Sequence, residues 1–340
     1  MQITSIKKSG RDLREPALWL RFGGGCEVRR SRHWIFPFQG VATERLVQFK
    51  RIAVLTDLAA ESEKIIRYAA ALARWYGAEL LLIHACSSAA SHTPRKSSFA
   101  SAESGTRVEQ NPEERLKSLV QELGLQDLVP RILVRKETIS ALISELDQYR
   151  PNLLVLATHG REGIRKWLAG SVAEEVFRRV QWPVLVIGPH CAGAESCSPK
   201  QLERVLYGTD LSADSVGALQ CAAGISHDHE SKLIALYVQL DPSQEFSYGR
   251  ALAEQRLKDW AQDHIDGFGE ALVSADFAIE FGKPQEKIIK AATRLQVDMI
   301  VLGARWFGHA SGAGSHFITG TAYEVSCASP CPVLLVPHPH

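Results

Sequence analysis

One sequence pattern occurs twice in this chain. RIAVLTDL at 51–58 returns as RVLYGTDL at 204–211, which is 153 residues later. Gly170-Ser171 likewise returns as Gly320-Thr321, and the last apolar strand returns as PVLLV at 332–336. A chain of 340 residues is too long for one ordinary hydrophobic core and suits two domains of about 150 residues each. The sequence therefore predicts two copies of one fold in tandem.

The repeat divides the chain into four parts. We expect a disordered extension over 1–48, a first domain over 49–189, a polar linker over 190–201 and a second, degenerate domain over 202–338. The extension is basic, with ten lysines and arginines up to Lys50 against four acids, and it shows no helical or strand period. No continuous apolar core follows its basic start, so we do not expect a secretion signal. Two alternatives stay open: its aromatic segment at 34–38 docks on the surface, or translation begins nearer Val41.

Strand and helix patterns alternate at short spacing within each copy. This order predicts a mostly parallel sheet and an α/β, doubly wound, Rossmann-like fold for each domain. In the first copy we expect strands at 51–57, 79–85, 132–134, 153–156 and 184–187, and helices at 61–76, 113–123 and 139–149. In the second copy the clearest helices are 250–265 and 284–295.

The stretch from Asn152 to Ile187 reads as a strand, a glycine-containing loop, a helix and a second strand. Gly160 lets the backbone approach an anion closely, and Gly170-Ser171 would present N–H groups at a helix N-terminus, where the dipole favours negative charge. Positive charge lies nearby in His159, Arg161, Arg165 and Lys166. The pattern indicates a phosphate site; the plain alternative is an ordinary helix start preceded by a turn glycine.

Several of these residues should meet at one edge of the sheet. Thr56-Asp57, Ala85 and the segment from Ala157 to Gly160 all follow the carboxyl ends of predicted strands, where doubly wound sheets bind their ligands. For Asp57 the alternative is a carboxylate that caps the next helix. For His84 a satisfied strand-end histidine is the favoured interpretation.

These segments resemble the nucleotide-binding segments of the universal stress protein family. That family has G-x-x-G, nine residues, then G-S or G-T; Gly160 and Gly170-Ser171 match, and the first family glycine falls on Ala157. The family opens on a strand ending P-T-D, which resembles Leu55-Thr56-Asp57. The resemblance covers roughly residues 50–338 and implies the adenine nucleotide α-hydrolase-like variety of the fold.

The resemblance also implies a ligand and its contacts. It implies ATP in the first domain, with Mg²⁺ held by the phosphates and water rather than by protein ligands. Asp57 would face adenine or ribose, and the glycine segments would cradle the phosphates. The implied binding residues are Thr56, Asp57, Ala85, Leu156, Ala157, His159, Gly160, Gly170, Ser171 and Val172; no catalytic residue is implied.

The second copy departs from the pattern where a phosphate would bind. Trp306 stands at the position of the loop glycine, and thirteen residues rather than nine separate it from Gly320. An indole there should block close approach of the backbone to a phosphate, which predicts a degenerate site. Gly303 survives, so an altered ligand stays open.

Composition excludes several classes of protein. A formal net charge of +1 argues against a general nucleic-acid binder. The sequence contains no run of about 18 apolar residues, so we expect no membrane span. The seven cysteines form no Cys-x-x-Cys pair, which is typical of reduced thiols and predicts a cytoplasmic protein. Neither Cys327 with Cys331 nor His309 with His316 has the further ligands that a metal site needs.

Three functions remain open at this point. The leading hypothesis is a universal stress protein that binds ATP in its first domain and acts as a nucleotide-dependent regulator of the stress response. The alternatives are a slow ATPase or nucleotidyl transferase of the same fold, and a nucleotide-free interaction scaffold. The family resemblance implies pairing through the last strands, Val184 to Ile187 and Val333 to Val336, which a tandem chain can satisfy internally as a pseudo-dimer; further homo-oligomer formation stays open.

Overall fold

The computed structural model describes residues 46–58, 62–85, 111–135, 139–157, 182–191, 202–240, 247–265, 274–304 and 320–337. All of them belong to Trp34–His340, the larger of the two units into which the chain divides. No described helix combines the length and the apolar character that a membrane crossing requires.

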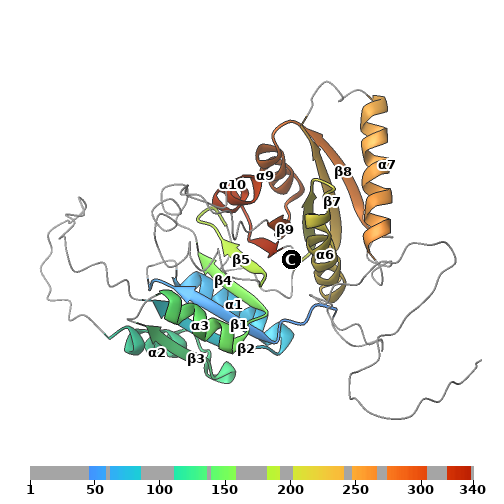
Figure 1. The fold of residues 1–340 in the computed structure, drawn as a ribbon. Coiled ribbons are helices and arrows are strands. Elements are labelled where there is room, and N and C mark those ends of the chain that lie inside the picture. Colours follow the sequence, from blue (N-terminus) through green and yellow to red (C-terminus); the bar gives the residue numbers. More distant parts are fainter. Residues whose placement is uncertain are drawn as a thin grey trace, which may run out of the picture. The chain divides into compact units, whose positions relative to one another are not determined.

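The first copy is a parallel sheet in the order β3-β2-β1-β4-β5 (Figure 1). Its strands run in parallel because a helix or a longer connection returns the chain after each of them. The α1 and α2 side chains join one buried cluster and those of α3 the other, so the sheet is covered on both faces. Its elements are β1 (Arg51–Thr56), α1 (Ser62–Tyr76), β2 (Glu79–Ala85), α2 (Pro112–Glu122), β3 (Arg131–Arg135), α3 (Ile139–Tyr149), β4 (Leu153–Ala157) and β5 (Val184–Ile187).

The second copy repeats this order as β8-β7-β6-β9-β10, again with parallel neighbours. Helices α6 and α7 cover one face of the strands, and α9 and α10 cover the other (Figure 1). Its elements are β6 (Arg204–Thr209), the short 3-10 helix η4 (Ala213–Ser215), α6 (Val216–Asp228), β7 (Lys232–Gln239), α7 (Ser247–His264), β8 (Asp276–Phe281), α9 (Pro284–Leu295), β9 (Met299–Ala304), α10 (Thr321–Ala328) and β10 (Val333–Pro337).

The predicted tandem α/β architecture is therefore confirmed, with one antiparallel pair added to it. β5 and β10 pair antiparallel, and the two five-stranded sheets become one sheet of ten strands. The predicted bounds of 79–85, 184–187, 139–149 and 284–295 are the observed ones. The other predicted elements differ by one to three residues at an end, as expected where helix ends are set by caps. The α2 helix, for example, begins at Pro112 behind Asn111, whose side chain accepts the Glu113 N–H at 3.2 Å.

In both copies, one side chain fixes the start of the central strand by accepting two backbone hydrogen bonds. In the first copy Oδ1 of Asn152 accepts the N–H groups of Lys50 and Arg51 at 3.1 and 3.0 Å. In the second copy Oδ2 of Asp298 accepts the two corresponding N–H groups, at 2.8 and 2.9 Å. An amide oxygen and a carboxylate oxygen thus accept equivalent pairs of hydrogen bonds, because only an acceptor oxygen is needed there.

Candidate functional site

In each copy the strand order reverses between the first and fourth strands. β1 lies between β2 and β4, and β6 lies between β7 and β9. Thr56 ends β1 and Ala157 ends β4, one residue beyond the paired Leu55 and Leu156. The carboxyl ends of these strands form the topological switch point, the position at which doubly wound sheets bind ligands.

The turn after β1 is held by short side-chain contacts. The buried Thr56 hydroxyl donates to Oγ of Ser62 at 2.6 Å and accepts the Leu58 N–H at 3.1 Å. Leu58 has a positive φ of 61°. Ser62, the first residue of α1, also donates to Oδ1 of the exposed Asp57 at 3.4 Å. The helix-capping alternative for Asp57 thus has a described contact.

The turn after β6 has the same construction. The Leu211 N–H donates to the Thr209 hydroxyl at 2.9 Å, and Leu211 has a φ of 60°. Oδ1 of Asp210 accepts the Ser215 hydroxyl at 2.8 Å and the Ser212 N–H at 3.0 Å. Asp210 therefore supports its own turn, and the paired serines at 62 and 215 are site residues that the motif reading missed although the repeat carries both of them.

His84 joins the ends of two neighbouring strands. Its Nδ1 donates to the Thr56 carbonyl at 2.9 Å, so the ring ties the end of β2 to the end of β1. This contact agrees with the prediction of a satisfied strand-end histidine. It also keeps neighbouring Ala85, which ends β2, beside the switch point.

A cavity of about 140 Å³ lies at the switch point of the second copy. Its lining residues are the counterparts of residues that the sequence assigned to the first-copy site. Thr209, Asp210, Val238, Leu302, Gly303, Thr321 and Ala322 correspond in turn to Thr56, Asp57, Ala85, Leu156, Ala157, Ser171 and Val172. In the second copy, where all seven of these positions are described, the counterparts of the predicted residues therefore line one cavity.

The second-copy cavity suits a triphosphate poorly. Its volume is below the roughly 300 Å³ at which pockets for drug-sized ligands begin. The described residues that line it include Asp210 and Asp214 but no lysine or arginine, whereas a nucleotide phosphate needs positive charge or N–H donors. Val238 also stands where the first copy has the smaller Ala85.

Gly303 packs directly on the turn that closes this cavity. A methyl group on its Cα would lie 2.9 Å from the Asp214 carbonyl oxygen and 3.3 Å from Cα of Ser215, which is too close for a real Cβ. The Tyr207 hydroxyl holds the same turn by donating to the Ser215 carbonyl at 2.9 Å. The first copy has Val54 and Ala157 at the corresponding positions, so neither contact is available to it in this form.

Five predicted site residues lie outside the described part of the chain: His159, Gly160, Gly170, Ser171 and Val172. The same is true of Trp306, His309 and His316 in the second copy. The described residues bring together Thr56, Asp57, Leu156 and Ala157, together with the backbone of Ala85.

The described cysteines offer no reactive nucleophile. Cys191, Cys221, Cys327 and Cys331 are all buried. Burial raises the pKa of the Cys221 thiol to about 12, so this residue stays protonated at neutral pH. Thiol chemistry therefore has no support in this part of the chain.

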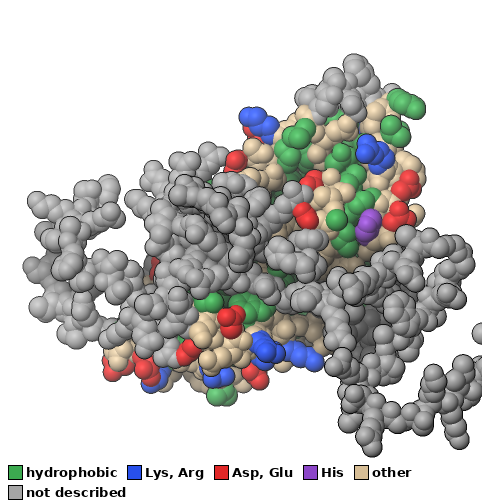
Figure 2. Space-filling model, viewed as in Figure 1, with side chains coloured by type: hydrophobic (Ala, Val, Ile, Leu, Met, Phe, Trp, Pro, Cys, Tyr) green, Lys and Arg blue, Asp and Glu red, His purple; other side chains and the backbone are tan. Residues whose placement is uncertain are grey.

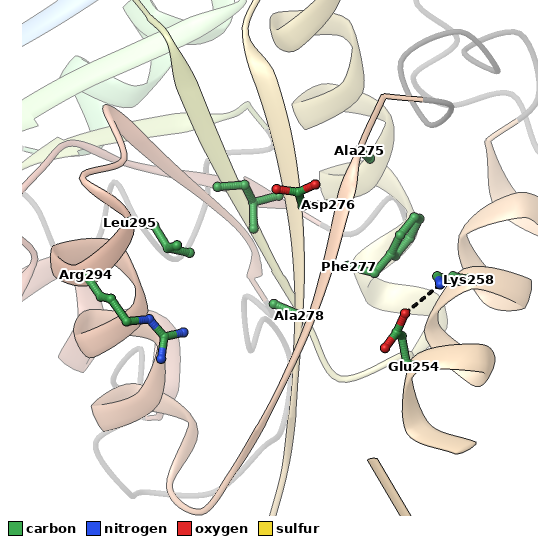
Figure 3. Close-up of a pocket in the computed structure, with 9 residues that line it drawn as sticks. Glu254, Lys258, Ala275, Asp276, Phe277, Ala278, Arg294 and Leu295 are labelled. Carbon is green, nitrogen blue, oxygen red and sulfur yellow. Dashed lines mark hydrogen bonds and ion pairs between the residues drawn. The ribbon is translucent and has the colours of Figure 1, made fainter. Parts of the chain in front are cut away.

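A second hollow follows the edge strand β8, between α7 and α9 (Figure 3). Phe277 and Ala278 form part of its floor, and charged residues surround it. Lys258 pairs with Glu254 at 2.6 Å, Lys232 with Asp276 at 2.7 Å, and Arg294 with Glu280 at 2.9 Å. Such charges disfavour the pairing of an edge strand with a further strand. We explain the charged residues around this hollow in that way and assign no ligand to it. Acidic and basic side chains are also interspersed on the face seen in Figure 2.

Comparison with known proteins identifies the family. The model of the universal stress protein family matches residues 48–188 and again residues 201–337. The chain belongs to the universal stress protein family. As a tandem universal stress protein it has a relative from Mycolicibacterium smegmatis, also named a universal stress protein, that is 24% identical over 300 residues, covering 84% of this chain and 96% of the relative.

Solved structures show the same fold. A universal stress protein from Archaeoglobus fulgidus superposes with a TM-score of 0.55 at 17% identity, covering 86% of this chain and 97% of that one. A putative universal stress protein from Pseudomonas aeruginosa gives 0.53 at 16% identity, covering 85% and 93%. Both likenesses extend over the two copies, which agrees with a tandem arrangement of one domain.

Proposed function

We propose that this universal stress protein binds one ATP, with Mg²⁺ on its phosphates, in the first copy, and that occupancy regulates a cytoplasmic stress response. The observation that carries the proposal is the hollow at the second-copy switch point, because counterparts of the predicted first-copy residues line it. Doubly wound folds bind ligands at this point, and in our proposal the glycine segment after β4 supplies the anion chemistry in the first copy.

The residues present fit this ligand in their chemistry. Thr56 and Asp57 offer oxygen acceptors at the mouth of the switch point, and the Asp57 side chain is exposed there. Ala85 is smaller than its counterpart Val238, which lines the second-copy cavity. Gly160, Gly170 and Ser171 are the residue types that let backbone N–H groups surround phosphates.

Binding rather than turnover is the better supported activity. The sequence has no G-x-x-x-x-G-K-[ST] loop, and its candidate for a general base beside the phosphate segment is His159, to which we assign phosphate contact instead. A steady ATP turnover of about 1 per second, the low end of ordinary enzyme rates, would favour the ATPase or transferase alternative instead.

The test is calorimetric titration of Mg-ATP into matched asparagine variants of the two copies. Asp57→Asn keeps an acceptor for Ser62 but removes the charge, and we expect a roughly tenfold loss of affinity, the size of one lost charge-assisted hydrogen bond. Asp210→Asn makes the same change in the second copy and should leave ATP binding unaltered. Equal losses in both variants, or none in either, would contradict a first-copy site that uses Asp57.

A further inference from the structure

The two copies meet about a pseudo-two-fold axis at the β5–β10 pair. Leu185 lies opposite Leu334, and these two residues occupy the same position in their respective copies. Val186 and Val184 lie opposite Val333 and Leu335 on either side. A contact in which each position meets its own counterpart is the geometry of a symmetric dimer.

The strand pair itself cannot distinguish one copy from the other. Both strands are short, aliphatic and almost fully buried, reading VLVI and VLLV. A β5 strand from a second chain would present the same backbone and nearly the same side chains. Strand pairing therefore contributes affinity but no choice of partner.

The ends of α1 and α6 meet at the same axis with unlike residues. The Tyr76 hydroxyl and Nε2 of His229 are joined by a hydrogen bond of 3.0 Å, and the two residues are 153 positions apart, the repeat offset. The Trp75 ring stacks on His229 with centroids 4.8 Å apart and an interplanar angle of 18°. A phenol and an imidazole thus occupy equivalent positions and contact each other.

The neighbouring pair of equivalent positions, 75 and 228, holds residues that differ more in their chemistry. Trp75 corresponds to Asp228, whose side chain has no exposed surface. Its carboxylate accepts the Leu46 N–H at 2.6 Å and the Val47 N–H at 2.9 Å, so the segment leading into β1 is bound by the second copy. The contact cannot be returned in kind, because Trp75 has no carboxylate to accept a backbone N–H. In addition, Pro199 stands 153 residues after Leu46 and has no N–H.

We propose that Tyr76, His229 and Asp228 make the two kinds of copy recognise each other and reject their own kind. Two first copies would set Tyr76 against Tyr76 and offer no carboxylate to the amides at 46 and 47. Two second copies would set His229 against His229 and leave the buried Asp228 carboxylate without the Leu46 and Val47 amides. In each like pair the amides or the carboxylate lose the partner that they have here, which is the usual way in which an interface excludes a wrong partner.

Cysteine trapping in the full chain tests the proposal. In a pair of first copies residue 185 would face residue 185 of another chain, so Leu185→Cys reports like pairing as an interchain disulfide. His229→Tyr or Tyr76→His makes the axis contact the same for like and unlike pairs. We expect each to raise the interchain disulfide roughly tenfold, the ratio that corresponds to about 1.4 kcal/mol of lost preference. The double variant Tyr76→His with His229→Tyr restores the unlike contact and should return the disulfide to the wild-type level.

In every variant, a pair of cysteines across the β5–β10 contact reports whether the two copies still pair within one chain. Leu185→Cys with Leu334→Cys should close an intrachain disulfide wherever the copies still pair within one chain. The proposal is overturned if the single variants leave interchain trapping unchanged or if the exchanged double variant stays as high as the single ones. Loss of intrachain closure with no gain in interchain trapping would also overturn it, because the residues would then only hold the fold together.

Discussion

The two switch points of this protein share one framework and differ in what fills it. Both copies end the central strand in Thr-Asp, continue through a leucine of positive φ and hold a serine hydroxyl at the next helix. In the second copy η4 packs on Gly303, the Tyr207 hydroxyl holds η4, and Val238 stands where the first copy has an alanine. A repeat can therefore keep the backbone geometry of a turn while a few side chains change the packing around it.

The largest effect should come from exchanging the small residues at the end of the fourth strand. Gly303→Ala places a methyl group 2.9 Å from the Asp214 carbonyl oxygen, so the turn must move. We expect a loss of about 1–3 kcal/mol in the free energy of unfolding, as in overpacked cores, measured by urea denaturation. The matched variant Ala157→Gly should change stability by less than about 1 kcal/mol. Equal losses would show that the packing of η4 on Gly303 does not distinguish the copies.

A smaller effect should follow from giving the first copy the second copy's valine. Ala85→Val adds two methyl groups where Val238 narrows the second-copy cavity. We expect ATP affinity to fall roughly threefold to tenfold, because overpacking displaces the ligand rather than removing a contact. Calorimetry gives the affinity, and Ala85→Gly is the control that should bind as wild type does. Unchanged affinity in Ala85→Val would place the nucleotide away from the end of β2.

The smallest effect concerns pH and the contact between the copies. Burial raises the pKa of the Asp228 carboxyl, although the amides of Val47 and Leu46 and nearby His227 oppose the shift. A raised folded-state pKa gives a stabilising contribution that is complete below the unfolded value, about 4, and is lost as pH rises through the folded value. The melting temperature of wild type relative to Asp228→Asn should therefore fall by about 2 °C between pH 4 and pH 7. A difference that grows with pH would contradict this sign.

The sequence predicted the fold because its apolar runs and its alternation of strand and helix patterns both indicate the same architecture. Apolar runs such as Leu153–Leu156 and the alternation with helices predict buried parallel strands, and the observed order follows. It did not predict that β8 forms an edge flanked by ion pairs, since two of those pairs, Lys232 with Asp276 and Arg294 with Glu280, join residues 44 and 14 positions apart. It did not point to Ser62, because a hydrogen bond across a turn depends on backbone geometry that has no motif of its own. It did predict a satisfied histidine at position 84, although not that its partner is the Thr56 carbonyl.

The interface between the copies was foreseen only in part. The resemblance predicted that the apolar last strands would pair within the chain, and β5 with β10 agrees with that prediction. The contact of Tyr76 with His229 had no local sign, because each residue alone is an ordinary helix-end aromatic or imidazole. Only the repeat offset, read together with the hydrogen bond, shows that they are equivalent positions.

The most direct test of a nucleotide site in the first copy alone is titration of Mg-ATP into wild type and into Gly160→Trp, which copies the tryptophan at position 306. We predict one site per chain in the wild type and no binding in the variant. Trp306→Phe, a change confined to the second copy, should bind as the wild type does. Absence of binding to the wild type, two sites per chain, or a site that survives Gly160→Trp would contradict the account.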